Sequence, residues 1–330
     1  MSGSAQPLLE IRALRTYFDT PDGTVKVLDG LDLDVQRGHI VGLVGESGSG
    51  KSVTAYSIMR LVRPPGRIAG GEIRFAGRDL LALRESEMRK VRGKEISMIF
   101  QDPRGFLDPV TRVGALLTEI YRTHEGVSRK QAKARALEMV SAVGLPAPRR
   151  VMRSYPHELS GGMAQRAMIA LALACAPKLL IADEPTTALD VTIQIQIIRL
   201  LANLRERFGL TIILITHNLN VVAEICDDVA VMYAGQIVEL GPSVEIFERP
   251  RHPYTVSLLR ARPTIVRGER LADIPGRVPD LLEPPSGCRF SPRCFMAEKI
   301  CCEEAPALRP LRPGHRSRCH FAERLEDAAA

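Results

Sequence analysis

A glycine-rich loop near residue 45 carries the residue types that bind phosphate groups. The stretch Gly45-Glu-Ser-Gly-Ser-Gly-Lys51-Ser52 matches the pattern G-x-x-x-x-G-K-[ST]. Glycines let the backbone curl so that successive N–H groups point at phosphate oxygens, and a helix that begins near Lys51 adds the positive end of its dipole. Lys51 would reach the β- and γ-phosphates of a nucleotide, and the Ser52 hydroxyl would ligate Mg²⁺. The other members of this predicted site are Ser47, Gly48, Ser49 and Gly50.

Two acidic residues follow a second apolar run, Leu-Leu-Ile-Ala at residues 179–182. A buried strand that ends in Asp can place that carboxylate near Mg²⁺, as expected here for Asp183. Glu184, one residue later, points elsewhere and can orient or deprotonate an attacking water. Alone, the two residues could equally be solvated acids at a strand end. The phosphate-binding pattern upstream favours the catalytic interpretation.

The segments around these residues alternate between strand and helix patterns. Leu31, Leu33 and Val35 alternate with polar residues, which is typical of a half-buried strand, and Asp22-Gly23 predicts a turn before them. Compact apolar runs, typical of buried parallel strands, occur at residues 40–44, 179–182 and 211–215.

Later segments complete the pattern. Ile96, Met98 and Phe100 alternate, and the alternation stops at Gln101. A helix is predicted over residues 128–143 with Ser128 as its N-cap. A second helix is predicted at residues 165–174, and a hairpin at residues 229–233 and 236–240. Strands that alternate with helices predict an α/β fold with a mostly parallel core sheet.

Composition is that of a soluble globular protein. The 330 residues are 45% hydrophobic and 25% charged, and no apolar run approaches the ~18–20 residues of a membrane span. Residues 1–7 do not resemble a secretory signal, so we expect a cytosolic protein unless a partner holds it at a membrane. The net charge of +7 fits an anionic ligand, nucleic acid or membrane surface, but it fits many other soluble proteins as well.

Cysteines and prolines mark the C-terminal part of the chain. Cys175 and Cys226 are expected in the core, whereas the other five of the seven cysteines fall between Cys288 and Cys319. In a cytosolic protein such clustering favours metal binding over disulfides. Prolines become frequent after about residue 248, which predicts a loop-rich appendage.

The stretch Leu159-Ser160-Gly161-Gly162-Met163-Ala164-Gln165 resembles the signature motif of ATP-binding cassette (ABC) ATPases. Gln101 resembles the Q-loop glutamine, Ala188-Leu189-Asp190 the D-loop, and His217 the H-loop histidine. Phe18 is similar to the aromatic residue that stacks on adenine, although Tyr17 beside it is an alternative. Because five motifs occur in the family's order, the chain is identified as a member of the ABC ATPases.

The resemblance implies an α/β fold, the P-loop ABC cassette, with a RecA-like parallel core, an antiparallel β subdomain and a helical subdomain at about residues 103–170. We expect this nucleotide-binding domain to span residues 1–250. Two such domains would bind head to tail, so that Ser160, Gly161 and Gly162 of one complete the ATP site of the other. The implied catalytic residues are Glu184, His217 and Gln101. The implied contacts to Mg²⁺ are Ser52, Gln101 and Asp183, and Asp190 completes the nucleotide site.

Further stretches resemble the ATPases of oligopeptide/dipeptide (and nickel) importers, and this resemblance covers nearly the whole chain. They are Thr20-Pro-Asp-Gly23, Ser97-Met-Ile-Phe-Gln-Asp-Pro103, Tyr155-Pro-His-Glu-Leu159, Ala182-Asp-Glu-Pro-Thr-Thr-Ala-Leu-Asp190 and His252-Pro-Tyr254. Residues 251–330 would form a C-terminal extension in which Cys288, Cys294, Cys301 and Cys319 hold a four-iron, four-sulfur cluster. Zinc is the alternative metal, and Cys302 departs from the family's pattern.

The expected function is therefore that of the ATP-hydrolysing motor of a peptide importer on the cytoplasmic face of the membrane. The implied partners are a homologous ATPase subunit, two transmembrane permease subunits and an extracytoplasmic solute-binding protein, with no nucleic acid. The alternatives are a motor for nickel or another small solute, an exporter motor, a translation-associated protein, or an ATPase acting on nucleic acid. Only about 108 residues separate Ser52 from the signature, which leaves little room for the coiled coil of a nucleic-acid-associated head.

Overall fold

The computed structural model describes residues 6–187, 189–261 and 274–325. It divides the chain into two compact units. The first unit combines Met1–Leu81 with Thr216–Ala330, and the second is Ala82–Ile215.

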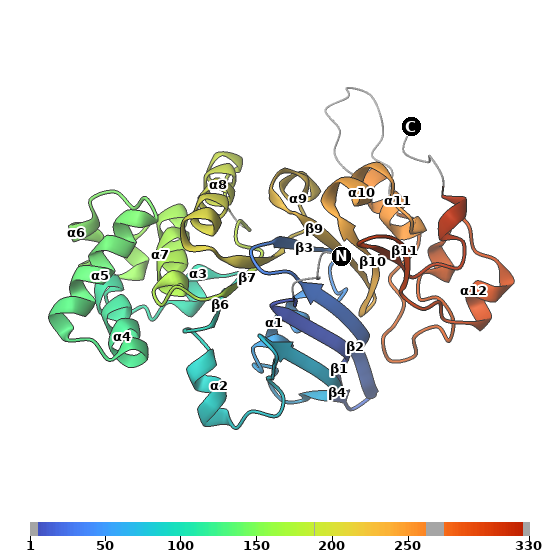
Figure 1. The fold of residues 1–330 in the computed structure, drawn as a ribbon, viewed down its shortest axis with the longest axis horizontal. Helices are drawn as coiled ribbons and strands as arrows, with labels where there is room; N and C mark the ends of the chain where they lie inside the picture. Colours follow the sequence, from blue (N-terminus) through green and yellow to red (C-terminus); the bar gives the residue numbers. More distant parts are fainter. Residues whose placement is uncertain (1–5, 188, 262–273, 326–330) are drawn as a thin grey trace. The chain divides into compact units, whose positions relative to one another are not determined.

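An antiparallel sheet of four strands opens the first unit (blue in Figure 1). Its strands follow the order β2-β1-β4-β5. They are β1 (Leu9–Thr20), β2 (Gly23–Val35), β4 (Gly66–Phe75) and β5 (Arg78–Asp79). In β2 the side chains of Leu31, Leu33 and Val35 are buried while their neighbours are partly exposed, which confirms the half-buried strand. The predicted turn also forms, since β1 and β2 are joined across Pro21 and Asp22.

A second set of strands in the first unit carries the phosphate-binding loop. β3 (Ile40–Val44) lies parallel to β9 (Asp228–Tyr233), and β9 forms the predicted hairpin with β10 (Gln236–Pro242). All five residues of β3 are buried, as expected for a strand with both faces covered. The helices of this unit are α1 (Lys51–Ile58), α9 (Leu219–Ile225), α10 (Ser243–Glu248), α11 (Pro253–Arg260) and α12 (Lys299–Glu303).

The proline-rich C-terminal segment contains more regular structure than its composition predicts. β12 (His315–Ser317) pairs with β10, and β11 (Arg309–Arg312) pairs with β12. The buried His315 Nε2 lies 2.8 Å from Glu239 Oε1 of β10. Polar pairing therefore attaches this hairpin to the sheet, so its strands lack the apolar pattern that reveals strands in sequence.

In the second unit, three parallel strands are adjacent in the order β8-β7-β6. They are β6 (Ile96–Ile99), β7 (Leu179–Asp183) and β8 (Thr211–Ile215). These pairings confirm the mostly parallel core. The alternation read at Ile96, Met98 and Phe100 was misleading, because all four residues of β6 are buried and the strand ends before Phe100.

Helices make up the rest of the second unit (cyan through green to olive-yellow in Figure 1). Ser128 caps α5 as predicted: its hydroxyl accepts from the Gln131 N–H, and the Gln131 side chain accepts from the Ser128 N–H. Within the described ranges, no helix is long and apolar enough to cross a bilayer. The helices are α2 (Glu85–Val91), α3 (Pro103–Phe106), α4 (Val113–Glu125), α5 (Arg129–Ala142), α6 (Pro148–Val151), α7 (Gly161–Leu173) and α8 (Val191–Phe208).

Candidate functional site

The phosphate-binding loop joins β3 to α1 in the first unit. Lys51 is only 7% exposed, and its ammonium donates hydrogen bonds of 2.9 Å to the carbonyl oxygens of Gly45 and Glu46. The loop's own carbonyl oxygens thus hold the lysine ammonium in place. Ser47 and Gly48 are exposed at the rim, whereas Ser49 and Gly50 are buried. The exposed backbone N–H groups of the loop and the buried ammonium of Lys51 together can bind an anion.

Gly45 is required at the start of this loop by a close approach of backbone. Its φ is +152°, and a Cβ at this position would lie 2.1 Å from the carbonyl oxygen of Met232 in β9. No side chain fits there without moving the strand. The glycine pattern read from sequence therefore has a steric cause at its first position.

Phe18 and Tyr17 lie next to each other near the end of β1 and have different neighbours. The Phe18 ring packs against Gly66, where an added Cβ would lie 2.5 Å from the ring. The Tyr17 hydroxyl donates a 2.8 Å hydrogen bond to Asp29, and Arg67 lies over the Tyr17 ring. Tyr17 is thus engaged by polar partners, while Phe18 presents a half-buried ring.

In the second unit, the carboxylate of Glu184 is held by two side chains. Gln101 Nε2 donates to Glu184 Oε2 at 3.0 Å, and the Thr187 hydroxyl donates to the same oxygen at 2.8 Å. The Glu184 backbone has a φ of +45°, and its N–H donates to the carbonyl of Ile215. A non-glycine residue in the left-handed region stores strain of about 1–3 kcal/mol and is typical of functional sites. Asp183, at the end of β7, is buried.

The signature and D-loop segments lie together in the second unit. Ser160 caps α7 by accepting from the Met163 N–H at 3.4 Å, and its side chain is exposed. Behind it, an added Cβ on Gly161 would lie 3.4 Å from Leu189, and one on Gly162 would lie 2.9 Å from Ile193. Small residues thus let the start of α7 pack against the segment that leads into α8. Ala188 of the predicted D-loop lies outside the described residues.

Asp190 and His217 occupy two further predicted positions. Asp190 caps α8, since its Oδ1 accepts from the Ile193 N–H at 2.9 Å. His217 is exposed in the first unit, one residue after Thr216, whose N–H donates to Leu43 in β3. The histidine therefore lies near the strand that leads into the phosphate-binding loop.

Four cysteines line one cavity in the C-terminal part of the first unit. Cys288, Cys294, Cys301 and Cys319 share its wall with His252, Phe290 and Phe321. The backbone N–H of Met296 points at the sulfur of Cys294, and that of Phe321 at the sulfur of Cys319, each at 3.4 Å. Such N–H contacts tune sulfurs that ligate iron.

Burial raises the pKa of the Cys294 thiol to about 11 and that of Cys319 to about 12. In the part of the chain that the structure describes, no three His, Cys, Asp or Glu side chains lie close enough together to hold a single metal ion. Cys302 is exposed, and Cys226 is buried in the core as expected.

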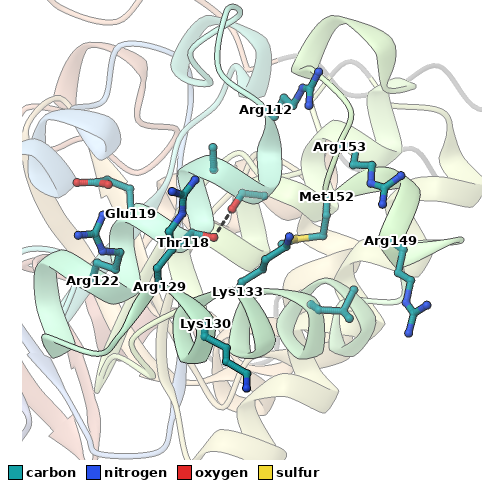
Figure 2. A pocket seen from close by; sticks show the side chains of 13 residues that line it. Arg112, Thr118, Glu119, Arg122, Arg129, Lys130, Lys133, Arg149, Met152 and Arg153 are labelled. Carbon is teal, nitrogen blue, oxygen red and sulfur yellow. Dashed lines mark hydrogen bonds between the residues drawn. The ribbon is translucent and has the colours of Figure 1, made fainter.

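A basic groove of about 1140 Å³ runs between α4, α5 and α6 in the second unit (Figure 2). Seven of its lining side chains are cations and one, Glu119, is an acid. Arg112 stacks over Tyr155. Among the described residues, none of the seven pairs with a carboxylate. The cations are Arg112, Arg122, Arg129, Lys130, Lys133, Arg149 and Arg153.

Tyr254 lies in the stretch His252-Pro-Tyr254 and has no predicted mechanistic role. Its buried hydroxyl accepts a 2.9 Å hydrogen bond from the Glu46 N–H in the phosphate-binding loop. The two partners are more than 200 residues apart in sequence, so no local pattern indicates this contact.

Comparison with known proteins places these features in a family context. A family described as "ABC transporter" matches residues 28–187, and one described as "Oligopeptide/dipeptide transporter, C-terminal region" matches residues 238–301. The chain is 51% identical to a probable peptide ABC transporter ATP-binding protein of Sinorhizobium fredii, over 96% of this chain and 95% of the relative. It is 50% identical to the oligopeptide transport ATP-binding protein OppD of Escherichia coli, over 96% of this chain and 93% of OppD.

Solved structures agree with the fold. A dimeric structure of the bacterial ABC transporter cassette MJ0796 superposes with a TM-score of 0.64 at 27% identity, covering 71% of this chain and 98% of that one. A post-hydrolysis dimer of the same cassette bound to ADP and Pi gives a TM-score of 0.65 at 26% identity, with the same coverage.

Proposed function

This chain belongs to the ATP-binding proteins of the ABC transporters, and we propose that it is the ATP-hydrolysing motor of a membrane importer for dipeptides and oligopeptides. The observation that carries the proposal is the near-complete alignment, at about half identity, with peptide transport ATP-binding proteins. The match of residues 238–301 to the peptide-transporter C-terminal region supports the same cargo. We also propose that the chain consists of a nucleotide-binding domain at residues 1–250 and a C-terminal extension at residues 251–330.

ATP binding is assigned to the loop and its neighbours. The backbone from Gly45 to Gly50 and the ammonium of Lys51 bind the phosphates, and Phe18 stacks on adenine, because its ring lacks the polar partners that engage Tyr17. Ser52, Asp183 and Gln101 would hold Mg²⁺, which would supply the positive charge that stabilises the phosphates.

Hydrolysis is assigned to residues that touch the attacking water or the γ-phosphate. Glu184 accepts a proton from the water, and Gln101 and Thr187 hold the Glu184 carboxylate in position. His217 donates to the γ-phosphate. No further base is required, since phosphoryl transfer depends mainly on positioning and charge.

A second cassette completes the site. The exposed Ser160 and the N–H groups at the start of the thirteen-residue helix α7 bind the γ-phosphate of ATP held by the facing cassette, and Asp190 lies at the same interface. Loss of the γ-phosphate removes this contact, so hydrolysis opens the pair. The facing cassette is a homologous chain.

The cysteine cavity is assigned to an iron–sulfur cluster. Four cysteines converge on one largely apolar cavity, and two of them already receive backbone N–H contacts on sulfur. Cluster ligation by four thiolates fits this donor set. Zinc, which would need the four sulfurs around a single ion, is the alternative metal, and metal analysis separates the two.

Two permease subunits, with an extracytoplasmic binding protein, are the partners through which the motor acts at the cytoplasmic face of the membrane. The helical segment at residues 103–170 faces the permeases, and its basic groove is the candidate contact surface (Figure 2). Gln101 lies at the start of this segment and links it to Glu184.

The experiment is reconstitution of the purified complex in lipid vesicles with its binding protein. ATPase activity is then measured with dipeptides, oligopeptides, nickel ions or DNA. We expect stimulation by peptides that is lost in Glu184→Gln. Stimulation by nickel ions alone would reassign the cargo, and stimulation by DNA in a salt-dependent manner would favour a nucleic-acid ATPase.

A further inference from the structure

A short turn between two of the cavity cysteines reaches the phosphate-binding loop. The guanidinium of Arg293 forms two hydrogen bonds with the Glu46 carboxylate, at 2.7 and 3.1 Å. The Arg293 side chain is 4% exposed and that of Glu46 27% exposed. A shielded two-point ion pair of this kind is stronger and more directional than an exposed one.

Arg293 has no freedom to follow Glu46 elsewhere. Its remaining N–H groups donate to the carbonyl oxygens of Ile274 and Pro275 and to the Tyr233 hydroxyl. Because the guanidinium is fixed by three other acceptors, it fixes the carboxylate. Glu46 is also the residue whose carbonyl accepts from Lys51. Its position therefore determines where the phosphate-binding lysine is held.

Arg289 supports the other end of the same loop. It donates to the Ala234 carbonyl at 2.5 Å and pairs with Asp29 at 2.6 Å, with its side chain 6% exposed. The next residue, Gly235, donates its N–H to the carbonyl of Ser49 in the phosphate-binding loop. The turn thus contacts the loop directly at Glu46 and indirectly at Ser49.

The turn is held by hydrogen bonds within its own backbone and by aromatic packing. The Ser291 N–H donates to the carbonyl of Cys288, and that of Arg293 to the carbonyl of Phe290, both at 3.0 Å. The buried Phe290 ring lies 5.1 Å from Tyr233 and 5.3 Å from Tyr254, measured between centroids. A displacement of Cys288 or Cys294 is therefore passed to both arginines.

We propose that this turn, residues 288–294, is a positioning element of the nucleotide site. Arg293 and Arg289 fix the phosphate-binding loop and so set its affinity for ATP, and the two cysteines that bound the turn, Cys288 and Cys294, hold both arginines in place. The inference rests on the proposed function, since it takes the loop to bind ATP.

The first test compares Arg293→Met with Arg309→Met in the full-length chain. Arg309 forms a similar two-point pair with Glu323 in the same C-terminal segment, but its strand, β11, is separated from β3 by β12, β10 and β9. Binding of a fluorescent ATP analogue with Mg²⁺ is titrated, together with KM and kcat. We expect Arg293→Met to raise Kd and KM about tenfold, the effect of losing one charged hydrogen bond, while kcat changes less. Arg309→Met should match the parent.

A second pair of variants guards against misfolding. Glu46→Gln removes the charge from the loop side, and Arg293→Lys restores a cation without the two-point geometry. We expect both to weaken ATP binding less than Arg293→Met. The Arg293→Met/Glu46→Gln double variant should bind as Arg293→Met does, because the two groups act as one unit. Folded Arg293→Met with parental Kd, or additive effects in the double variant, would overturn the positioning role.

The role of the cysteines that bound the turn is tested with Cys294→Ser. The control is Cys302→Ser, because Cys302 is exposed. Iron and zinc contents are measured alongside Kd for the analogue. We expect Cys294→Ser to reduce the metal content and to weaken ATP binding several-fold. Added to Arg293→Met, the same substitution should cause no further loss of ATP affinity. Parental Kd in Cys294→Ser, with or without loss of metal, would refute control of the loop by the cysteines. Failure of the parent to bind ATP at all would instead refute the proposed function.

Discussion

The side-chain amide of Gln101 donates a 3.0 Å hydrogen bond to the carboxylate of Glu184, across 83 residues of sequence. Gln101 lies just after β6 and Glu184 just after β7, which are adjacent parallel strands. The carboxyl ends of parallel strands meet at one edge of a sheet, where α/β proteins build their sites. The bond therefore joins the segment that begins the helical region to the residue that would activate water.

Replacing Glu184 with Gln removes the base and keeps the size of the side chain. We expect ATP binding to persist and hydrolysis to fall by about 10²–10⁴, the usual contribution of a general base. Paired cassettes should accumulate with ATP. Nucleotide affinity, phosphate release and sedimentation measure these effects, and parental turnover would remove Glu184 from its catalytic role.

Lys51→Ala removes the buried ammonium of the phosphate-binding loop. A charged hydrogen bond contributes about 1.5–3 kcal/mol, so ATP affinity should fall by at least tenfold. Lys178→Ala is a matched control, because Lys178 pairs with Glu95 and is 53% exposed. Equal nucleotide affinity in Lys51→Ala and the control, measured by calorimetry, would contradict the assignment of the loop.

Cys319→Ser removes one sulfur from the cavity. We expect iron content to fall, with loss of visible absorption, whereas Cys302→Ser should keep both. Plasma mass spectrometry and an absorption spectrum of anaerobically purified protein provide the measurement. Zinc in place of iron would select the alternative metal, and equal metal content in both variants would exclude Cys319 as a ligand.

Lys130→Glu combined with Lys133→Glu reverses two charges in the basic groove (Figure 2). We expect weaker association with the permease subunits and a smaller dependence on salt, since charge steers such contacts. Lys299→Glu, in an exposed position with 88% side-chain exposure, is the control. Permease pull-down at two ionic strengths compares them, and unchanged recovery of the double variant would exclude the groove from the interface.

Local patterns predicted much of the fold. The Ser128 capping box, the β9–β10 hairpin and the loop before Lys51 all follow from near neighbours in sequence. The β11–β12 hairpin was missed because its buried contact is polar, between His315 and Glu239. β6 was misread because a strand covered on both faces shows no alternation.

The sequence predicts the local parts of the site but not its long-range contacts. The spacing of the glycines predicts the phosphate-binding loop. At Gly45 only glycine fits, because a Cβ would collide with the backbone of Met232. Nothing in the spacing of Arg293 and Glu46 indicates that they meet, because the pair depends on how distant segments pack. The same holds for Thr187, whose hydrogen bond to Glu184 becomes visible only in the structure.

The most direct measurement is a structure of the ATP-loaded importer complex carrying Glu184→Gln. The relevant distance joins Ser160 Oγ of this chain to the γ-phosphate of ATP in the facing cassette. We predict hydrogen-bond contact, about 3 Å, with the loop of the facing cassette on the other side of the same triphosphate. ATP bound in a complex whose Ser160 touches no triphosphate would contradict the account.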